Sequence, residues 1–263
     1  MFGKFLEKLI TKIGRNKSVK RLFLSASGEN LLAQNNAYFQ NGFNRELAIS
    51  TLNKTLNKIY GKNYSEDLGM WSEHLILFAA IKNQAPDLSR ILEIGTFDGQ
   101  TSRILSDLFP NSEITTIDLP LQSVKHKNIY KYAQRDNYME NFRSENLSKC
   151  SNVTFVEKTS LALINHTGSY DLIWIDGAHG YPIVAIDIAN SIRMCNPNGF
   201  ILCDDVYKFT RSNDSEYMST ATYETLLEFQ HSGFIEFQLI LKRINKIYSF
   251  NKKYVGIIKK VFN

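Results

Sequence analysis

The sequence has few cysteines and no long apolar run. The three cysteines among its 263 residues follow no metal-type spacing, so neither a disulfide scaffold nor a zinc cluster is indicated. We therefore expect reduced thiols in a cytoplasmic protein. The longest apolar run, 75–81, is far too short to cross a bilayer. Charged residues at positions 7, 8 and 12 interrupt any apolar core that a signal peptide would need.

Basic residues are concentrated at the two ends of the chain. The net charge is +5, yet residues 1–21 carry seven Lys or Arg against Glu7 alone, and residues 242–260 carry seven and no acid. Apolar residues at helical spacing over 2–13 predict an amphipathic helix. We expect this helix to dock on the protein, on a partner subunit of a homo-oligomer, or on the inner face of the membrane. Nucleic acid is not an expected partner, because the basic charge is terminal and is not spread along one face with interleaved aromatics.

Residues 1–70 are predicted to form a helical extension. Helical periodicity covers about 44–60 and 72–83, with Ser72 as the expected N-cap of the second helix. Residues 25–45 are polar and rich in Asn, which predicts a loop.

The main domain, residues 71–263, alternates strands and helices after position 90. The predicted strands and helices cover 91–94, 101–109, 113–117, 153–157, 170–175, 182–194, 200–203 and 217–230. This alternation predicts an α/β fold with a doubly wound, mostly parallel sheet and right-handed crossovers. Two consecutive strands, 234–241 and 254–260, are predicted to pair as an antiparallel hairpin. The run 196–199 (Asn-Pro-Asn-Gly) is predicted to be a turn.

A glycine turn follows the first strand of this domain. Gly95 and Gly99 bracket the turn, and the second strand ends in Asp118 about twenty residues later, a layout that suits a ligand with a ribose. Dinucleotide sites prefer G-x-G-x-x-G, but here the middle glycine position is Phe97. Glu93, an acid just before the turn, suits a cationic ligand better than a pyrophosphate. These residues favour S-adenosylmethionine, which carries an ammonium and a sulfonium group.

Acidic residues also end the later strands. Asp176 ends the fourth strand, and Asp204 and Asp205 end the fifth, so the three carboxylates are expected at the same edge of the sheet. An all-oxygen set of this kind suits Mg²⁺, although strand-end Asp residues also cap helices and one of the two adjacent residues could point away. His179 follows Asp176 closely and is the natural general base, since its ordinary pKa lies near neutral pH.

Four features resemble class I S-adenosylmethionine-dependent methyltransferases. They are the glycine turn, Asp118, the run 175–181 (Ile-Asp-Gly-Ala-His-Gly-Tyr) and the run 199–205 (Gly-Phe-Ile-Leu-Cys-Asp-Asp). Within that class they resemble the branch of macrocin-type sugar O-methyltransferases, over about residues 72–260. The resemblance implies a seven-stranded sheet, with His179 as the base. It implies Mg²⁺ held by Asp176, Asp204 and Asp205. It implies cofactor contacts from Glu93, Gly95, Thr96, Gly99, Asp118 and Ser160. After the third strand, however, the chain has Lys-Thr-Ser where the family often has Gly-Asp-Ser.

We therefore expect Mg²⁺-dependent O-methylation of a sugar or other polyhydroxylated small molecule, in glycan or natural-product biosynthesis. One alternative is a nucleic-acid or protein methyltransferase. Amino-directed DNA enzymes typically carry Asn/Asp-Pro-Pro-Tyr after the fourth strand, whereas residues 176–179 are Asp-Gly-Ala-His. Another alternative is a cofactor-binding protein without catalysis. Such a protein would have no physical reason to keep clustered carboxylates, which repel one another. Iron-dependent hydroxylation is a further use of a similar framework, but it would need His-rich ligation.

Overall fold

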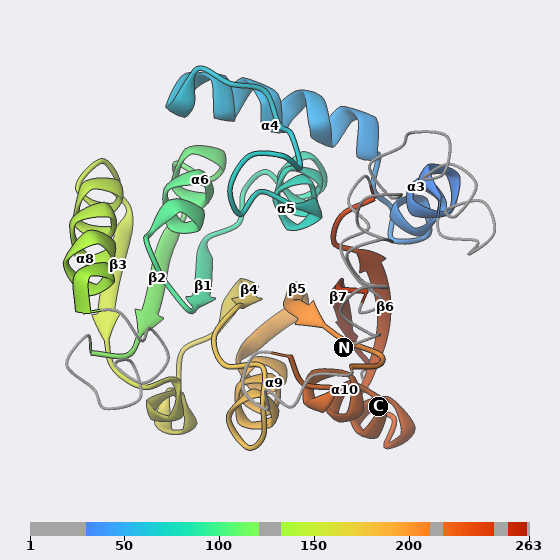
Figure 1. Cartoon of the computed structure of the whole chain (residues 1–263). Helices are drawn as coiled ribbons and strands as arrows, with labels where there is room; N and C mark the ends of the chain where they lie inside the picture. Colours follow the sequence, from blue (N-terminus) through green and yellow to red (C-terminus); the bar gives the residue numbers. More distant parts are fainter. Residues whose placement is uncertain (1–29, 121–132, 211–217, 245–251, 262–263) are drawn as a thin grey trace, which may run out of the picture.

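The computed structural model describes residues 30–120, 133–210, 218–244 and 252–261 (Figure 1). The amphipathic helix predicted over 2–13 lies outside these residues. Within the described part of the chain, none of the helices is both long and apolar enough to span a bilayer.

A single seven-stranded sheet forms the centre of the molecule. The strands are β1 (Arg90–Ile94), β2 (Glu113–Asp118), β3 (Val153–Glu157), β4 (Tyr170–Ile175), β5 (Cys195–Val206), β6 (Ile235–Leu241) and β7 (Tyr254–Lys260). Their order is β3-β2-β1-β4-β5-β7-β6. The first five run parallel to one another, whereas β7 pairs antiparallel with both β5 and β6. The predicted doubly wound sheet with a C-terminal hairpin is confirmed.

Helices cover both faces of the sheet. They are α3 (Leu31–Gln40), α4 (Arg45–Tyr60), α5 (Glu73–Gln84), α6 (Gln100–Leu108), α8 (Ala133–Leu147), the 3₁₀ helix η1 (Ser160–Asn165), α9 (Ile183–Met194) and α10 (Ala221–His231). In Figure 1, α4, α5 and α6 lie on one side of the sheet, and α9 and α10 lie on the other. Ligands of such open sheets bind where the parallel strands end, so this layering leaves one sheet edge for the site.

Alternate residues of the central strands enter two separate cores. On β1, Ile91 belongs to the core shared with α4 and α5, whereas Leu92 and Ile94 belong to the core shared with α9. On β4, Trp174 points into the first core and Ile173 into the second. A parallel strand covered by helices on both faces needs apolar side chains on both. This requirement explains the nearly continuous apolar runs from which the strands were predicted.

The predicted loop over 25–45 is wrong for residues 31–40, which form α3. Asn30 caps this helix by accepting a hydrogen bond from the backbone N–H of Ala33. Gln34 then pairs with the backbone of Leu241, donating to its carbonyl at 2.9 Å and accepting from its N–H at 3.2 Å. The helix thus depends on contacts about two hundred residues away, which the polar local sequence does not reveal.

Helices α3 and α4 share a hydrophobic core with the sheet. Tyr38 and Leu52 are fully buried in the same cluster as Trp174 and Ile257. The division into an extension at 1–70 and a domain at 71–263 stays a prediction.

The fifth strand is longer than predicted. The expected turn at 196–199 lies inside β5, where the register against β4 shifts between Tyr170 and Leu172. Asn198 has a positive φ of 63°, a conformation that Asn tolerates better than most residues. The turn-like sequence therefore marks an irregularity within a continuous strand.

Candidate functional site

The glycine turn brings two loops into backbone contact at the edge of the sheet. Gly95 has a φ of 102°, and a Cβ there would lie 2.2 Å from the carbonyl oxygen of Asp176. Only glycine allows this approach. Gly99, with a φ of 73°, is the N-cap of α6. The loop after β1 is therefore fixed against the loop that carries Asp176 and His179.

Glu93 is buried within the sheet and does not lie on an open surface. Its Oε2 accepts hydrogen bonds from the hydroxyls of Ser102 and Thr116, while Oε1 has no hydrogen-bond partner among the described residues. Thr116 also bonds the hydroxyl of Thr96, at 2.7 Å. Burial raises the pKa of Glu93 from 4.5 to about 7, against the opposing effect of the two hydroxyls. The carboxyl group is thus partly protonated near neutral pH.

Asp118 lies at the end of β2, as predicted, but protein donors already surround it. Its Oδ2 accepts from the N–H of Phe97 at 2.8 Å and from Arg143 at 3.2 Å, and its Oδ1 accepts from the N–H of Leu119 at 2.8 Å. Arg143, on α8, also donates to the Phe97 carbonyl at 2.6 Å. A carboxylate offers about four acceptor positions. Both hydroxyls of a ribose would therefore fit only if Arg143 withdrew.

Ser160 begins η1 directly after the Thr159 cap. Its hydroxyl influences Asp187, a fully buried residue of α9. Burial raises the pKa of Asp187 to about 7, and the Ser160 hydroxyl opposes this rise. Whether Ser160 also contacts an adenine stays a prediction.

Asp204 and Asp205 both contact the ammonium group of Lys242. The Lys242 Nζ donates to Asp204 Oδ2 and lies 2.5 Å from Asp205 Oδ1. Lys253 approaches the second oxygen of Asp205, also at 2.5 Å. The Lys242 residue is only 5% exposed, so its contact with Asp204 is a buried ion pair.

Adjacent residues of a strand normally point to opposite faces, yet Asp204 and Asp205 converge. Asp205 has a positive φ of 48°, and the register between β5 and β7 shifts between Cys203 and Val206. Such a conformation is strained for a residue other than glycine, and bulges of this kind re-aim side chains at functional sites. The irregularity turns both carboxylates toward the same ammonium group.

The backbone of Lys242 is held from two sides. Its N–H donates to the carbonyl of Lys253 at 2.9 Å, and its own carbonyl accepts from the N–H of Glu73 at 3.0 Å. Lys242 and Lys253 therefore belong to the folded body of the protein, although they lie in the basic stretch 242–260. Both lysines face carboxylates of the sheet, because the C-terminal hairpin returns beside β5.

His179 and Asp176 lie together beside this cluster. The His179 Nε2 is 3.8 Å from Asp176 Oδ1, and His179 is buried. Burial lowers the pKa of His179, although the charges of Asp205 and Asp204 oppose the shift. Burial and the neighbouring Asp204 carboxylate raise the pKa of Asp176 above its usual range. The imidazole is consequently neutral near pH 7 and able to accept a proton.

His74, for which the sequence predicted no role, lies close to the same cluster. Its ring stacks on Trp174 with centroids 5.2 Å apart, and its Nδ1 lies 2.6 Å from the Ser72 hydroxyl. Burial lowers its pKa to about 4 against the opposing charge of Asp204. Ser72 precedes α5 as predicted, but its side chain bonds His74 and no backbone N–H of the helix.

The carboxylates converge as the metal prediction requires, but their oxygens already face cations. Three of the four carboxylate oxygens of Asp204 and Asp205 contact Lys242 or Lys253. Across the part of the chain that the structure describes, no three His, Cys, Asp or Glu side chains are placed to hold a metal ion together. In this arrangement, the donor set does not fit a divalent ion.

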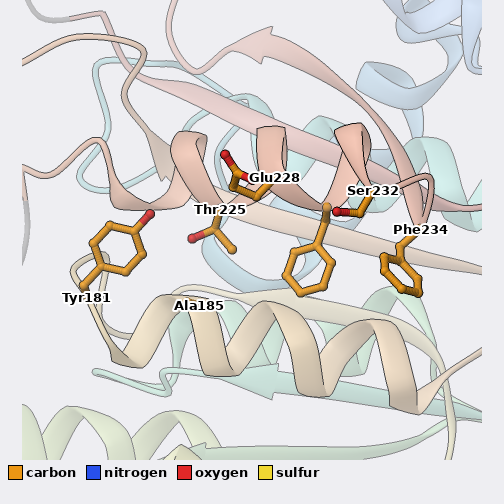
Figure 2. Close-up of a pocket in the computed structure, with 7 residues that line it drawn as sticks. Tyr181, Ala185, Thr225, Glu228, Ser232 and Phe234 are labelled. Carbon is orange, nitrogen blue, oxygen red and sulfur yellow. The ribbon is translucent and has the colours of Figure 1, made fainter.

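A separate groove runs between α9 and α10 (Figure 2). It has a volume of about 290 Å³. Its lining residues are Tyr181, Ala185, Thr225, Glu228, Phe229, Ser232 and Phe234. Glu228 is the sole charged member of this lining, and none of the predicted site residues belongs to it. The groove is therefore distinct from the carboxylate cluster.

Comparisons with known proteins relate the central part of this chain to methyltransferases. Residues 92–206 match a family model described as a methyltransferase domain. No curated protein matches the chain's sequence. The match includes all the strand-end residues from Glu93 to Asp205.

Solved structures share the fold at low sequence identity. One of them is the O-methyltransferase TomG from Streptomyces achromogenes, which is involved in tomaymycin synthesis and was solved in complex with S-adenosylmethionine. It superimposes with a TM-score of 0.53 at 15% sequence identity, and the alignment covers 95% of this chain and 99% of TomG. The methyltransferase PaMTH1 from Podospora anserina, bound to S-adenosylhomocysteine, has a TM-score of 0.51 and 18% identity, covering 82% and 88%. The match of residues 92–206 to a methyltransferase domain supports the predicted enzyme class, and the solved structures share the fold of this chain.

Proposed function

We propose that this chain transfers a methyl group from S-adenosylmethionine to a hydroxyl of a small molecule, with a sugar or another polyhydroxylated compound as the substrate class. The observation that carries the proposal is the pairing of the buried His179 with the half-buried Asp176 at the carboxyl end of β4. An O-methyl acceptor must lose its proton as the new bond forms, and a neutral imidazole is a suitable base. The O-methyltransferase with the same fold supports the choice of oxygen as the acceptor.

The cofactor is proposed to lie at the carboxyl ends of β1 and β2. The glycine turn leads there into the N-terminus of α6, and Asp118 would supply the acid expected beside a ribose. When bound, S-adenosylmethionine would supply the electrophilic methyl group. The protein would position the acceptor and hold its proton on His179. Backbone contact between Gly95 and Asp176 fixes this base relative to the cofactor loop.

Calorimetric titration with S-adenosylhomocysteine tests the cofactor, and a turnover assay tests the base. Turnover is followed by release of S-adenosylhomocysteine across a panel of sugars, nucleotide sugars and polyols. His179→Asn is expected to abolish turnover while retaining cofactor affinity, because it removes only the proton acceptor. The control is His231→Asn, at an exposed position on α10. Tight NADH binding without S-adenosylhomocysteine binding would contradict the proposal.

The predicted Mg²⁺ requirement remains a prediction, and no step of this mechanism is assigned to a metal. The homo-oligomer and the contact of residues 1–21 with a membrane also remain predictions. Sedimentation with anionic vesicles, at low and high salt, tests the membrane contact. Equilibrium ultracentrifugation of the full chain tests the oligomer.

A further inference from the structure

A lysine occupies the centre of the acidic cluster. Lys242 contacts one carboxylate oxygen of Asp204 and one of Asp205, and it is buried in the described structure. Its backbone is hydrogen-bonded to both Lys253 and Glu73. These bonds anchor the lysine between the hairpin and α5. The position of the charge is thus determined by the fold, and not by a flexible surface side chain.

The fixed charges of the cluster balance without an added ion. Two carboxylates, Asp204 and Asp205, face two ammonium groups, Lys242 and Lys253. A buried ion pair is tolerated only when its oxygens and protons are well satisfied, and these contacts meet that condition for three of the four oxygens. A divalent ion among the same oxygens would lie beside an ammonium group of like sign, which disfavours its binding.

We propose that Lys242 is the resident cation of this site, replacing a divalent metal ion as the group that holds Asp204 and Asp205 together. The inference rests on the proposed function and argues against the Mg²⁺ requirement that the sequence predicted. Lys242 acts here as a positioning residue. Its ammonium group fixes the two carboxylates beside the loop of Asp176 and His179, and thereby maintains the surroundings of the base without contacting the acceptor.

Direct metal binding tests the proposal independently of any substrate. The wild-type protein is titrated with Mn²⁺, and free Mn²⁺ is measured by electron paramagnetic resonance. We expect no stoichiometric binding at millimolar Mn²⁺. Lys242→Met removes the ammonium group at similar volume and frees one oxygen on each of Asp204 and Asp205. This variant is expected to bind one Mn²⁺ per chain at least tenfold more tightly than wild type, with competition by Mg²⁺.

Three further variants locate the effect. Lys242→Arg keeps the positive charge and is expected to exclude Mn²⁺ like the wild type, which a merely structural role of the side chain does not predict. Adding Asp204→Asn to Lys242→Met is expected to abolish the new Mn²⁺ binding. Lys259→Met, at an exposed position on β7, is the matched control and is expected to leave Mn²⁺ binding unchanged.

Stoichiometric Mn²⁺ binding by the wild type, lost in Asp204→Asn, would overturn the proposal even if Lys242→Met failed to fold. A folded Lys242→Met variant that gains no Mn²⁺ binding would overturn it as well. Circular dichroism establishes folding of each variant. S-adenosylhomocysteine titration of the wild type is performed in parallel, so failure of the cofactor assignment is distinguished from failure of the lysine assignment.

Discussion

Glu93 provides a quantitative test of the buried acid beneath the glycine turn. Its side chain is fully buried, and its pKa rises from 4.5 to about 7 because burial disfavours the charged form. Between these two pH values the folded protein keeps a proton that the unfolded chain releases. The free energy of unfolding therefore falls as pH rises through this interval, and the loss is complete above about pH 7.

The size of the loss follows from the two pKa values. Each pH unit corresponds to 1.36 kcal/mol, so the interval from 4.5 to about 7 corresponds to about 3 kcal/mol. Glu93→Gln removes the titration and leaves a neutral side chain that still accepts from Ser102 and Thr116. Its amide lacks one partner at every pH, which shifts its stability by a constant amount. The free energy of unfolding of Glu93→Gln, minus that of the wild type, should therefore rise by about 3 kcal/mol between pH 4.5 and pH 8.

Urea unfolding of both proteins at several pH values between 4.5 and 8 measures this difference. Glu113→Gln is the matched control, since Glu113 lies on the neighbouring strand with 86% of its side chain exposed. Its stability should follow the wild type at every pH. Parallel pH profiles for Glu93→Gln and the wild type would refute the reasoning, because they would show that Glu93 has an ordinary pKa in the folded protein.

Three further predictions concern the cofactor, the core and the base. Asp118→Ala is expected to weaken S-adenosylhomocysteine binding by about 1.5–3 kcal/mol, the usual value of charge-assisted hydrogen bonds, and unchanged calorimetric affinity would argue against a ribose contact. Asp187→Asn is expected to gain up to about 4 kcal/mol in urea unfolding between pH 4 and pH 8, because burial raises the pKa of Asp187 from 3.8 to about 7. The kcat/KM of the wild type is expected to stay flat above pH 6.5 and to fall only at lower pH, since the pKa of the His179 base is lowered; a fall beginning above pH 6.5 would contradict that assignment.

Much of the fold could be predicted because its signals are local. Apolar runs ending in an acid mark strands that are buried on both faces, and the strand-end residues Asp176, Asp204 and Asp205 do meet at one edge of the sheet. Helix α3 escaped prediction because its stability depends on Gln34 bonding to the distant Leu241. No periodicity within a short polar segment reveals such a contact.

The partners of the site residues were also beyond the sequence signals. Lys242 and Lys253 belong to a run of basic residues that resembles a solvated tail, and only the return of the hairpin beside β5 brings them to the carboxylates. Arg143 lies on a helix with little amphipathic pattern, yet its guanidinium reaches Asp118. One local feature did indicate a partner for Lys242, because this lysine directly follows an apolar strand. A charged side chain in such a position is buried only when it has a partner.

The contact between Gly95 and Asp176 links the glycine turn, where the cofactor is proposed to bind, to the loop of Asp176 and His179. Since a Cβ at Gly95 would collide with the Asp176 carbonyl oxygen, the two loops are in direct backbone contact. Asp176 N donates to Ile94 O at 2.8 Å, which adds a hydrogen bond between the same segments. Transfer of a group between two bound reactants depends on their mutual placement within about an ångström. Gly95, which the sequence suggested only as a place for a ligand to approach, thus also holds the loop of His179, the proposed base, in a fixed position relative to the turn after β1.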